Sequence, residues 1–315
     1  MSRSLVHRRA LSEVFLTDSR TTDGTHFVAA AQLPPSHAYF TDHTTAAVVD
    51  PLLLLECCRQ AETHAVHAHF GAPRNTKFVL KSWTLDLPEP ADLPSGHGPT
   101  PLVLAVGTQD AQWSSGALRA LTYRMRIEVD SRQVGEARMQ VQYVPDAVYG
   151  TLRRRGRSGP VPTSDDFRAA AAGEPVAPAR VGRTRPENVI LLDARTEPDA
   201  VRARLRIAGD HPSLFDHAQD HVPGMVLMEA GRQAFLLAAE EFTGDPASSW
   251  CLVGLEASFG AYAELDAPLT VVGHRPTTVA RAGGRAALGV RVTFEQAGRP
   301  VAEAAFTGVS TRGGQ

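Results

Sequence analysis

Glutamate and arginine recur three residues apart in two apolar segments of this chain. Glu229 is followed by Arg232 and Gln233, and Glu56 is followed in the same way by Arg59. Side chains three residues apart project from one face of a helix. A carboxylate shielded from water can take a proton from an attacking hydroxyl group, and an arginine can bind phosphate through two hydrogen bonds. We therefore predict that Glu229 and Glu56 are catalytic and that Arg232, Arg59 and Gln233 bind substrate.

The same residues also have a structural interpretation. Glu229 and Arg232 could form an ordinary ion pair on a helix surface, and Gln233 could join the helix to a strand. The residues around them are apolar on every side of the segment. This pattern argues against a solvated ion pair and favours a functional one.

A polar loop that contains histidines leads into the second apolar segment, with the sequence Phe-Asp-His-Ala-Gln-Asp-His-Val-Pro-Gly at residues 215–224. His217 can transfer protons near neutral pH, and His221 can position a substrate. Proline before Gly224 is typical of a helix start, whose free N–H groups can stabilise a developing oxyanion. We predict that His217 is catalytic and that His221 and Gly224 bind substrate. The alternative is that both histidines form hydrogen bonds within the loop.

Both apolar segments belong to a repeat that spans most of the chain. Four blocks of matching residues occur in the same order in both halves: 6–18 with 181–193, 37–43 with 211–217, 53–61 with 226–234, and 134–137 with 301–304. This order indicates an internal duplication. We place the first repeat at residues 1–146 and the second at 181–311. Residues 147–180 are rich in Pro, Gly and Arg and are predicted to be an exposed connector, with Arg153 to Arg157 a solvated run of charge.

Each repeat contains one long apolar segment, at residues 51–70 and 223–242, with the composition of a buried helix. Two short apolar runs precede each segment, and several alternating, β-branched stretches follow it. One helix wrapped by an antiparallel sheet is the hotdog arrangement. The predicted fold is therefore α+β, a tandem double hotdog in which two helix-wrapped antiparallel sheets form a pseudo-dimer within one chain.

The overall composition excludes several classes of protein. The formal net charge is −2, so no electrostatic attraction to nucleic acid or to an anionic membrane is expected. No apolar run approaches the length of about 18 residues that a membrane span needs, and the N-terminal segment lacks the apolar stretch of a signal peptide. Cys57, Cys58 and Cys251 lack metal-ligand spacing and are interpreted as reduced thiols. We expect a cytoplasmic protein.

Residues 215–234 resemble the helix entrance of hotdog acyl-carrier-protein dehydratases. In those enzymes a histidine loop leads through Pro-Gly and four apolar residues to Glu-Ala and a later Gln. Here Gly224, Glu229 and Gln233 fit that frame, but the position of the dehydratase histidine is Phe215. The resemblance therefore indicates a related fold and substrate class rather than simple dehydration.

The fuller pattern is Asp-His-x-x-Asp-His-Val-Pro-Gly-Met, ending in Glu-Ala-x-Arg-Gln-Ala, at residues 216–234. It is similar to the A-factor biosynthesis (AfsA-type) family of γ-butyrolactone and butenolide autoregulator synthases, and the similarity covers both repeats. It implies an acyltransferase that moves a β-ketoacyl group from an acyl-carrier-protein thioester to dihydroxyacetone phosphate. An intramolecular condensation then leads to a phosphorylated butenolide, the precursor of a γ-butyrolactone or furan-type signal of secondary metabolism. The first copy departs from the pattern, since residues 49–51 are Val-Asp-Pro.

Two other functions are compatible with these residues. One is a hotdog dehydratase or thioesterase that acts on acyl thioesters, and the other is a non-catalytic regulator that binds an acyl ligand. Glutamate and arginine are retained in both copies, which argues against the regulator. No metal or other cofactor is expected, because the hotdog frame explains the histidines and aspartates without one. Since one chain already forms the pseudo-dimer, we expect a monomer.

Overall fold

Each half of the chain folds around one long helix. The computed structural model describes residues 1–45, 48–91, 98–155, 157, 159–168, 172–281 and 286–311. Helix α1 (Pro51–Ala68) begins where the Asp50 carboxylate accepts a hydrogen bond of 2.8 Å from the Leu52 N–H. Helix α3 (Gly224–Thr243) ends at Gly244, whose φ of 80° is readily adopted only by glycine. Both helices are buried along most of their length because their side chains are apolar on nearly every face.

Antiparallel strands wrap both helices. The first half contains β1 (Leu16–Thr21), β2 (His26–Leu33), β3 (Lys77–Asp86), β4 (Thr100–Ser114), β5 (Ala117–Val129) and β6 (Arg132–Val144). The second half contains β7 (Leu191–Glu197), β8 (Ala200–Leu205), β9 (Trp250–Phe259), β10 (Leu269–His274), β11 (Thr277–Ala280), β12 (Ala286–Gln296) and β13 (Arg299–Ser310). Short 3-10 turns lie at Arg3–Leu5, Leu11–Glu13, Ser164–Phe167, Pro178–Val181, Pro186–Asn188 and Ala247–Ser249.

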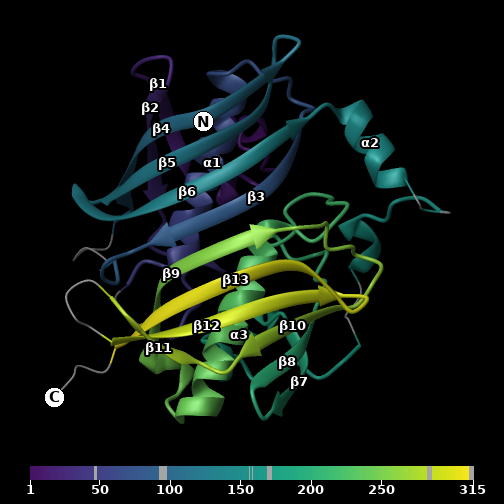
Figure 1. The fold of residues 1–315 in the computed structure, drawn as a ribbon. Coiled ribbons are helices and arrows are strands. Elements are labelled where there is room, and N and C mark those ends of the chain that lie inside the picture. Colours follow the sequence, from purple (N-terminus) through teal and green to yellow (C-terminus); the bar gives the residue numbers. More distant parts are fainter. Residues whose placement is uncertain are drawn as a thin grey trace.

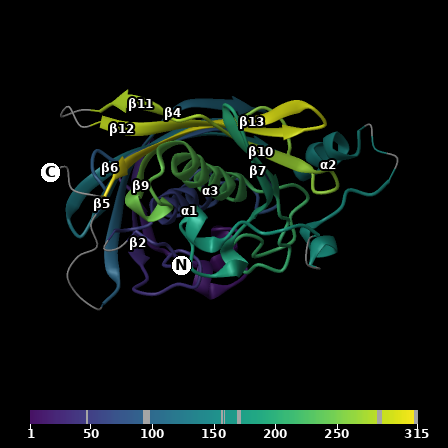
Figure 2. The ribbon, with the colours of Figure 1, turned by 90° about the horizontal axis from the view of Figure 1, so that it is seen from below.

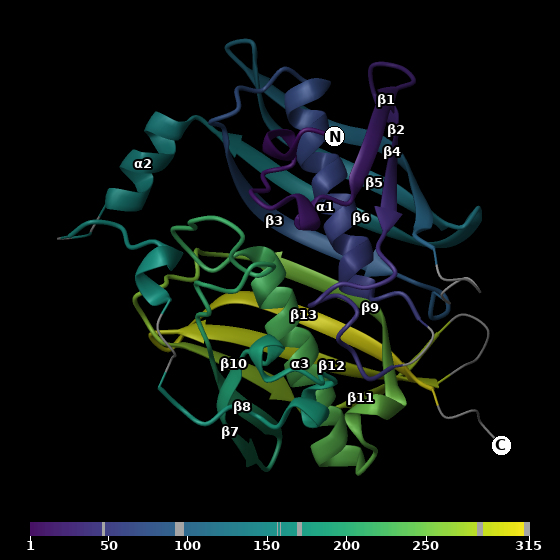
Figure 3. The same cartoon turned by 180° about the vertical axis from the view of Figure 1, so that it is seen from behind.

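The two halves share one continuous sheet. Its order is β1-β2-β4-β5-β6-β3-β9-β13-β12-β10-β8-β7, and β11 pairs with β12. The halves meet where β3 and β9 run antiparallel, with Ser82 opposite Ser258 and Leu85 opposite Leu255 (Figure 1). Both long helices lie on the same face of this sheet (Figures 2 and 3). The predicted α+β double hotdog is confirmed.

Helix α3 lies unusually close to the sheet at Gly231. A Cβ atom at this position would lie 2.3 Å from the nearest ring atom of Phe306, on β13, and 3.3 Å from the Phe294 ring on β12. Both phenylalanines are fully buried. Glycine therefore sets the distance at which this helix can cross the strands.

The connector is more ordered than the sequence predicts. Helix α2 (Asp146–Arg154) begins at the last residue of the predicted first repeat. Arg153 is buried and forms ion pairs of 2.6 Å with Glu264 and 3.1 Å with Asp220, and Arg157 forms ion pairs with Glu264 and Asp266. The prediction of a solvated arginine run is thus wrong for these two residues, because acidic groups of the second half contact them.

All three cysteines are buried, and none forms a disulfide bond within the described residues. Within the described ranges, no helix has the length and apolar character needed to cross a membrane.

Candidate active site between the two halves

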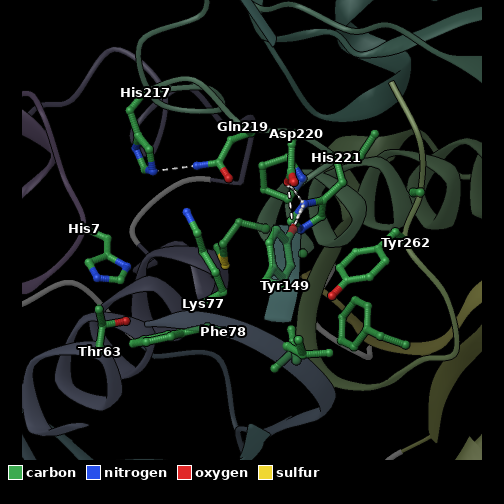
Figure 4. A pocket seen from close by; sticks show the side chains of 18 of the residues that line it. His7, Thr63, Lys77, Phe78, Tyr149, His217, Gln219, Asp220, His221 and Tyr262 are labelled. Atoms are coloured by element: carbon green, nitrogen blue, oxygen red, sulfur yellow. Dashed lines mark hydrogen bonds and ion pairs between the residues drawn. The ribbon is translucent and has the colours of Figure 1, made fainter. Parts of the chain in front are cut away.

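A cavity of about 1230 Å³ lies between the two halves. The first half contributes Arg59, Glu62 and Thr63 of α1 together with residues of β3. The second half contributes the loop before α3, the first residues of α3 and the segment after β9. In Figure 4, Thr63 and His221 lie on opposite sides of this space. The site is therefore composite, with a helix wall from one repeat and a loop wall from the other.

Two equivalent aspartates hold the loops in place across the pseudo-dimer. Asp216 accepts hydrogen bonds from the backbone N–H groups of Arg9 and Ala10 in the first half. Asp42, its counterpart, accepts them from Thr184 at 3.0 Å and Arg185 at 3.2 Å in the second half. These carboxylates position the loops.

His221 and Asp220 form a pair on the loop wall of the cavity. The Asp220 carboxylate lies 2.7 Å from Nδ1 of His221, accepts a 2.9 Å hydrogen bond from the Tyr149 hydroxyl and contacts Arg153 at 3.1 Å (Figure 4). Burial alone would raise the pKa of Asp220, but His221, Tyr149 and Arg153 hold it well below its usual value. The ionised carboxylate favours the tautomer with the proton on Nδ1, which leaves Nε2 as the basic nitrogen.

His217 also lines the cavity, but both of its ring nitrogens have partners. Nδ1 lies 3.4 Å from the Asp216 carboxylate, and Nε2 lies 2.6 Å from the side-chain nitrogen of Gln219 (Figure 4). Burial lowers the pKa of His217, so its ring is mainly neutral near pH 7. This geometry suits a residue that shapes the loop better than one that carries a proton.

Arg59 is the cation that α1 contributes to the helix wall. Its Nε and Nη2 atoms each lie 2.7 Å from a carboxylate oxygen of Glu56, and Nη1 donates a longer hydrogen bond of 3.3 Å to Thr63. The side chain is 19% exposed and lines the cavity, whereas Glu56 is fully buried behind it. Glu56 thus holds one edge of the guanidinium group, while Nη1 contacts Thr63, which also lines the cavity.

Neither predicted catalytic glutamate lines this cavity. Glu56 has a second arginine partner, Arg8, at 2.7 Å; burial would raise its pKa, but the charges of Arg59 and Arg8 lower it to about 2. Glu229 is equally buried and contacts Arg183 at 2.9 Å and Arg232 at 2.5 Å. Both carboxylates are buried outside the cavity and each is bound by two arginines, so this geometry gives their predicted role as bases no support.

Gln233 and its counterpart Gln60 also lie away from the cavity. Gln233 donates a hydrogen bond to the Asn188 carbonyl and accepts one of 3.0 Å from the Ile190 N–H. Gln60 accepts a hydrogen bond of 2.9 Å from the Phe15 N–H. Each glutamine joins its helix to the chain just before the first strand of its repeat, as in the structural interpretation above.

The equivalent space in the other half of the pseudo-dimer is nearly closed, with a volume of about 30 Å³. Arg232, the counterpart of Arg59, lines it, and its Nη1 atom lies 2.9 and 2.8 Å from the two carboxylate oxygens of Asp50. The same Asp50 carboxylate caps α1 at the Leu52 N–H. The Asp50 carboxylate therefore neutralises Arg232 and also caps the start of α1.

Pro223 holds the position of Asp50 at the start of α3. It has no side-chain oxygen, and within the described structure no side chain caps this helix end. The N–H groups of Gly224 and Met225, which line the open cavity, therefore remain available to a ligand. A Cβ atom on Gly224 would lie 3.0 Å from Leu80, so glycine also keeps this corner of the cavity open.

Sequence reasoning missed three features of the site. Asp220 and Tyr149 were not assigned roles, although Asp220 directly precedes His221. Arg8 occurs in the repeated Val-x-Arg pattern, which was the available signal. Glu62 lines the cavity, is 2% exposed and accepts a hydrogen bond of 2.7 Å from Tyr143; burial raises its pKa to about 7. No repeat marks Glu62, since its counterpart is Phe235.

A helix-wrapped sheet in each half, edge-to-edge pairing of the halves and a cavity between them define a double-hotdog protein. Two solved structures have this architecture. A putative thioesterase from Novosphingobium aromaticivorans has a TM-score of 0.52 and 15% identity, covering 93% of this chain and 97% of its own. A putative oleoyl thioesterase from Lactobacillus plantarum has a TM-score of 0.52 and 8% identity, covering 92% of this chain and 98% of its own. At these identities the likeness shows the fold alone.

Sequence similarity identifies the family. A family model described as the A-factor biosynthesis hotdog domain matches residues 1–145 and 165–312. A Streptomyces virginiae protein named 2-oxo-3-(phosphooxy)propyl 3-oxoalkanoate synthase is 36% identical, covering 93% of this chain and 92% of its own length. A Streptomyces coelicolor protein of the same name is 31% identical, with coverage of 94% and 87%. The chain belongs to the A-factor biosynthesis hotdog family, as its motifs predict.

Proposed function

We propose that this chain is an acyltransferase that joins a β-ketoacyl group, delivered as an acyl-carrier-protein thioester, to the hydroxyl group of dihydroxyacetone phosphate. The name of the Streptomyces relatives describes an ester with these two parts, a 3-oxoalkanoate and a 2-oxo-3-(phosphooxy)propyl group. Intramolecular condensation of the ester leads to a phosphorylated butenolide, from which a γ-butyrolactone or furan-type signal is made.

One observation carries this proposal: the two equivalent sites differ in the groups that acyl transfer needs. In the open cavity, His221 offers a basic nitrogen, Arg59 a cation, and Gly224 with Met225 two backbone donors. In the closed site, Asp50 occupies both the arginine and the helix start. The open cavity is thus equipped for a thioester and a phosphorylated alcohol, while its counterpart is not.

The reaction follows from these groups. Nε2 of His221 takes the proton of the substrate hydroxyl group as its oxygen attacks the thioester carbon. The N–H groups of Gly224 and Met225 stabilise the negative oxygen of the tetrahedral intermediate. The intermediate collapses and expels the thiolate, which takes the proton back from His221. Asp220 stabilises the imidazolium form between these two steps.

The remaining predicted residues take supporting roles in this proposal. Glu56 orients the guanidinium of Arg59, so that Arg59 binds the phosphate group of the acceptor. His217 shapes the loop wall. Glu229, Arg232 and Gln233 stabilise the closed half and the contact between helix and strand. In this proposal His221 accepts the proton of the hydroxyl group, the role that the sequence had suggested for Glu229.

The experiment is a mass-spectrometric assay of the purified protein with a β-ketoacyl thioester and dihydroxyacetone phosphate. A new phosphorylated ester or its cyclic dehydrated product is expected. Free β-keto acid as the sole product would identify a thioesterase, and no turnover of an authentic carrier-protein substrate would favour the acyl-binding regulator.

Two histidine variants locate the reaction within the molecule. His221→Ala should lose ester formation by roughly 100-fold or more, since a positioned base contributes about that factor. His43→Ala is the matched control, because His43 lines the closed pocket, and it should retain most of the activity. Equal losses in both variants would contradict the assignment of the open cavity.

We place this reaction in the cytoplasm, where the three buried cysteine thiols would remain reduced. The composite cavity is complete within a single chain, which supports a monomer.

A further inference from the structure

Exposed cations gather at the opening of the cavity. Residues that are exposed and also line the cavity lie at its opening, and six of them are basic: Arg3, Arg9, Arg74, Lys77, Lys81 and Arg155. The chain has many arginines but only two lysines, and both are in this set. The positive opening contrasts with the formal net charge of −2 for the whole chain.

The carboxylates of the cavity wall do not neutralise this opening. Within the described structure four line the cavity, and none is exposed. Asp216 accepts backbone hydrogen bonds, Asp220 and Glu264 contact Arg153, and Glu62 contacts Tyr143. Among the basic residues, Lys77 lies 3.5 Å from Asp146, while no ion pair is found in the described structure for Arg74, Lys81 or Arg155. The surface charge around the opening is therefore positive.

We propose that these residues form the docking surface for the acidic face of the carrier protein that delivers the acyl group. The cations come from three separate segments, the N-terminus, the region from Arg74 through β3, and the end of α2. A cofactor-sized anion needs only a compact cluster, whereas cations spread over several segments suit the broader surface of a protein. Leu152 of α2 is 51% exposed beside them and offers an apolar contact that a protein partner can bury. This inference rests on the proposed acyl transfer.

Charge reversal at the opening tests the docking surface separately from the chemistry. The variant combines Arg74→Glu, Lys81→Glu and Arg155→Glu; Lys77 is left intact because it contacts Asp146 and Tyr149. With the carrier-protein thioester, kcat/KM should fall roughly 10- to 100-fold through slower association, and its decrease with added salt should become shallower. With a short pantetheine thioester of the same acyl group, kcat/KM should stay within about twofold of the unaltered protein.

The matched control reverses three exposed arginines that do not line the cavity, Arg132→Glu, Arg195→Glu and Arg299→Glu. It changes the net charge equally and should leave the carrier-protein reaction nearly unaffected. An equal fall in kcat/KM in both triple variants would overturn the docking surface. So would a fall of the same size when the opening variant is tested with the short thioester. A coenzyme A thioester is the third substrate. If charge reversal at the opening lowers kcat/KM with the coenzyme A thioester but not with the carrier-protein thioester, the cations bind nucleotide phosphates, and the proposal is overturned. If the unaltered protein turns over neither thioester with dihydroxyacetone phosphate, the proposed function itself fails.

Discussion

Asp50 and Pro223 hold equivalent positions at the starts of the two long helices, and they leave different groups available. Asp50 bonds to Arg232 and to the Leu52 N–H, while Pro223 can bond to neither Arg59 nor the Met225 N–H. At the scale of single residues, this difference explains why one site is open and the other closed.

The substitution Pro223→Asp should therefore close the active site. The new carboxylate would cap α3 at Met225 and pair with Arg59, as Asp50 does in the other half. We expect kcat/KM for ester formation to fall at least about 100-fold, while thermal stability stays unchanged or rises through the added cap. The control Pro223→Ala brings no carboxylate and should keep most of the activity. If Pro223→Asp remained as active as Pro223→Ala, the proposed donors would be excluded.

Glu62 should make stability depend on pH in the opposite sense from Glu56. Because the folded pKa of Glu62 is raised from 4.5 to about 7, its contribution to stability is present below pH 4.5 and is lost as pH rises toward 7, by about 3 kcal/mol. Glu56, with a folded pKa of about 2, contributes stability above pH 4.5 and loses it as pH falls toward 2.

Urea unfolding at pH 5 and pH 8 measures this effect. The unaltered protein should lose up to about 3 kcal/mol of unfolding free energy between pH 5 and pH 8 through Glu62. Glu62→Gln should lack this loss and should therefore be relatively more stable at pH 8. An equal loss in both proteins would mean that Glu62 ionises as an exposed carboxyl group does.

Some of the residues predicted from the sequence line the cavity, and others do not, for a physical reason. Arg59, His217, His221 and Gly224 line the cavity as expected of binding or catalytic residues. Glu56 shares α1 with Arg59, and Glu229 shares α3 with Gly224. Their partners Arg8 and Arg183, however, lie far away in sequence. Spacing along a helix shows which side chains share a face, and it does not show what packs against that face.

At the scale of elements, Gly231 controls the approach of α3 to β13. Replacing glycine by alanine within a helix normally stabilises by about 1 kcal/mol. Here the added Cβ atom would meet the buried Phe306 ring, and overpacking costs roughly 1–3 kcal/mol or more. We therefore expect Gly231→Ala to be destabilising in urea unfolding. Gly24→Ala, where the new Cβ meets nothing within 4 Å, is the control; equal stability of the two variants would show that the helix can shift.

The elements themselves were largely predictable. Both long helices lie near their predicted ranges, and strands follow each of them as predicted, because the apolar patterns are long and regular. Helix α2 was missed because its segment is short, polar and rich in arginine. Its order depends on ion pairs with Asp220 and Glu264, which belong to the other half of the chain. Tertiary contacts of this kind leave no periodic signal.

At the scale of the whole molecule, the duplication should produce one binding site per chain. The closed pocket of about 30 Å³ has room for about one water molecule, whereas the open cavity is large enough for an acyl chain and its acceptor. Calorimetric titration with a non-reactive pantetheine amide of the acyl group should therefore give a stoichiometry of one per chain. A value of two would show that the closed pocket opens on binding.

The composite cavity also changes what a mutation can do. In a dimer of identical hotdog subunits, the two sites have the same helix wall and the same loop wall. A single substitution therefore changes both sites at once. Here the helix wall is encoded in the first repeat and the loop wall in the second. Each wall can therefore vary independently of its duplicate. A substitution in either wall therefore alters the fit of the acyl chain or of its acceptor in this one cavity, and the equivalent position of the other repeat keeps its residue.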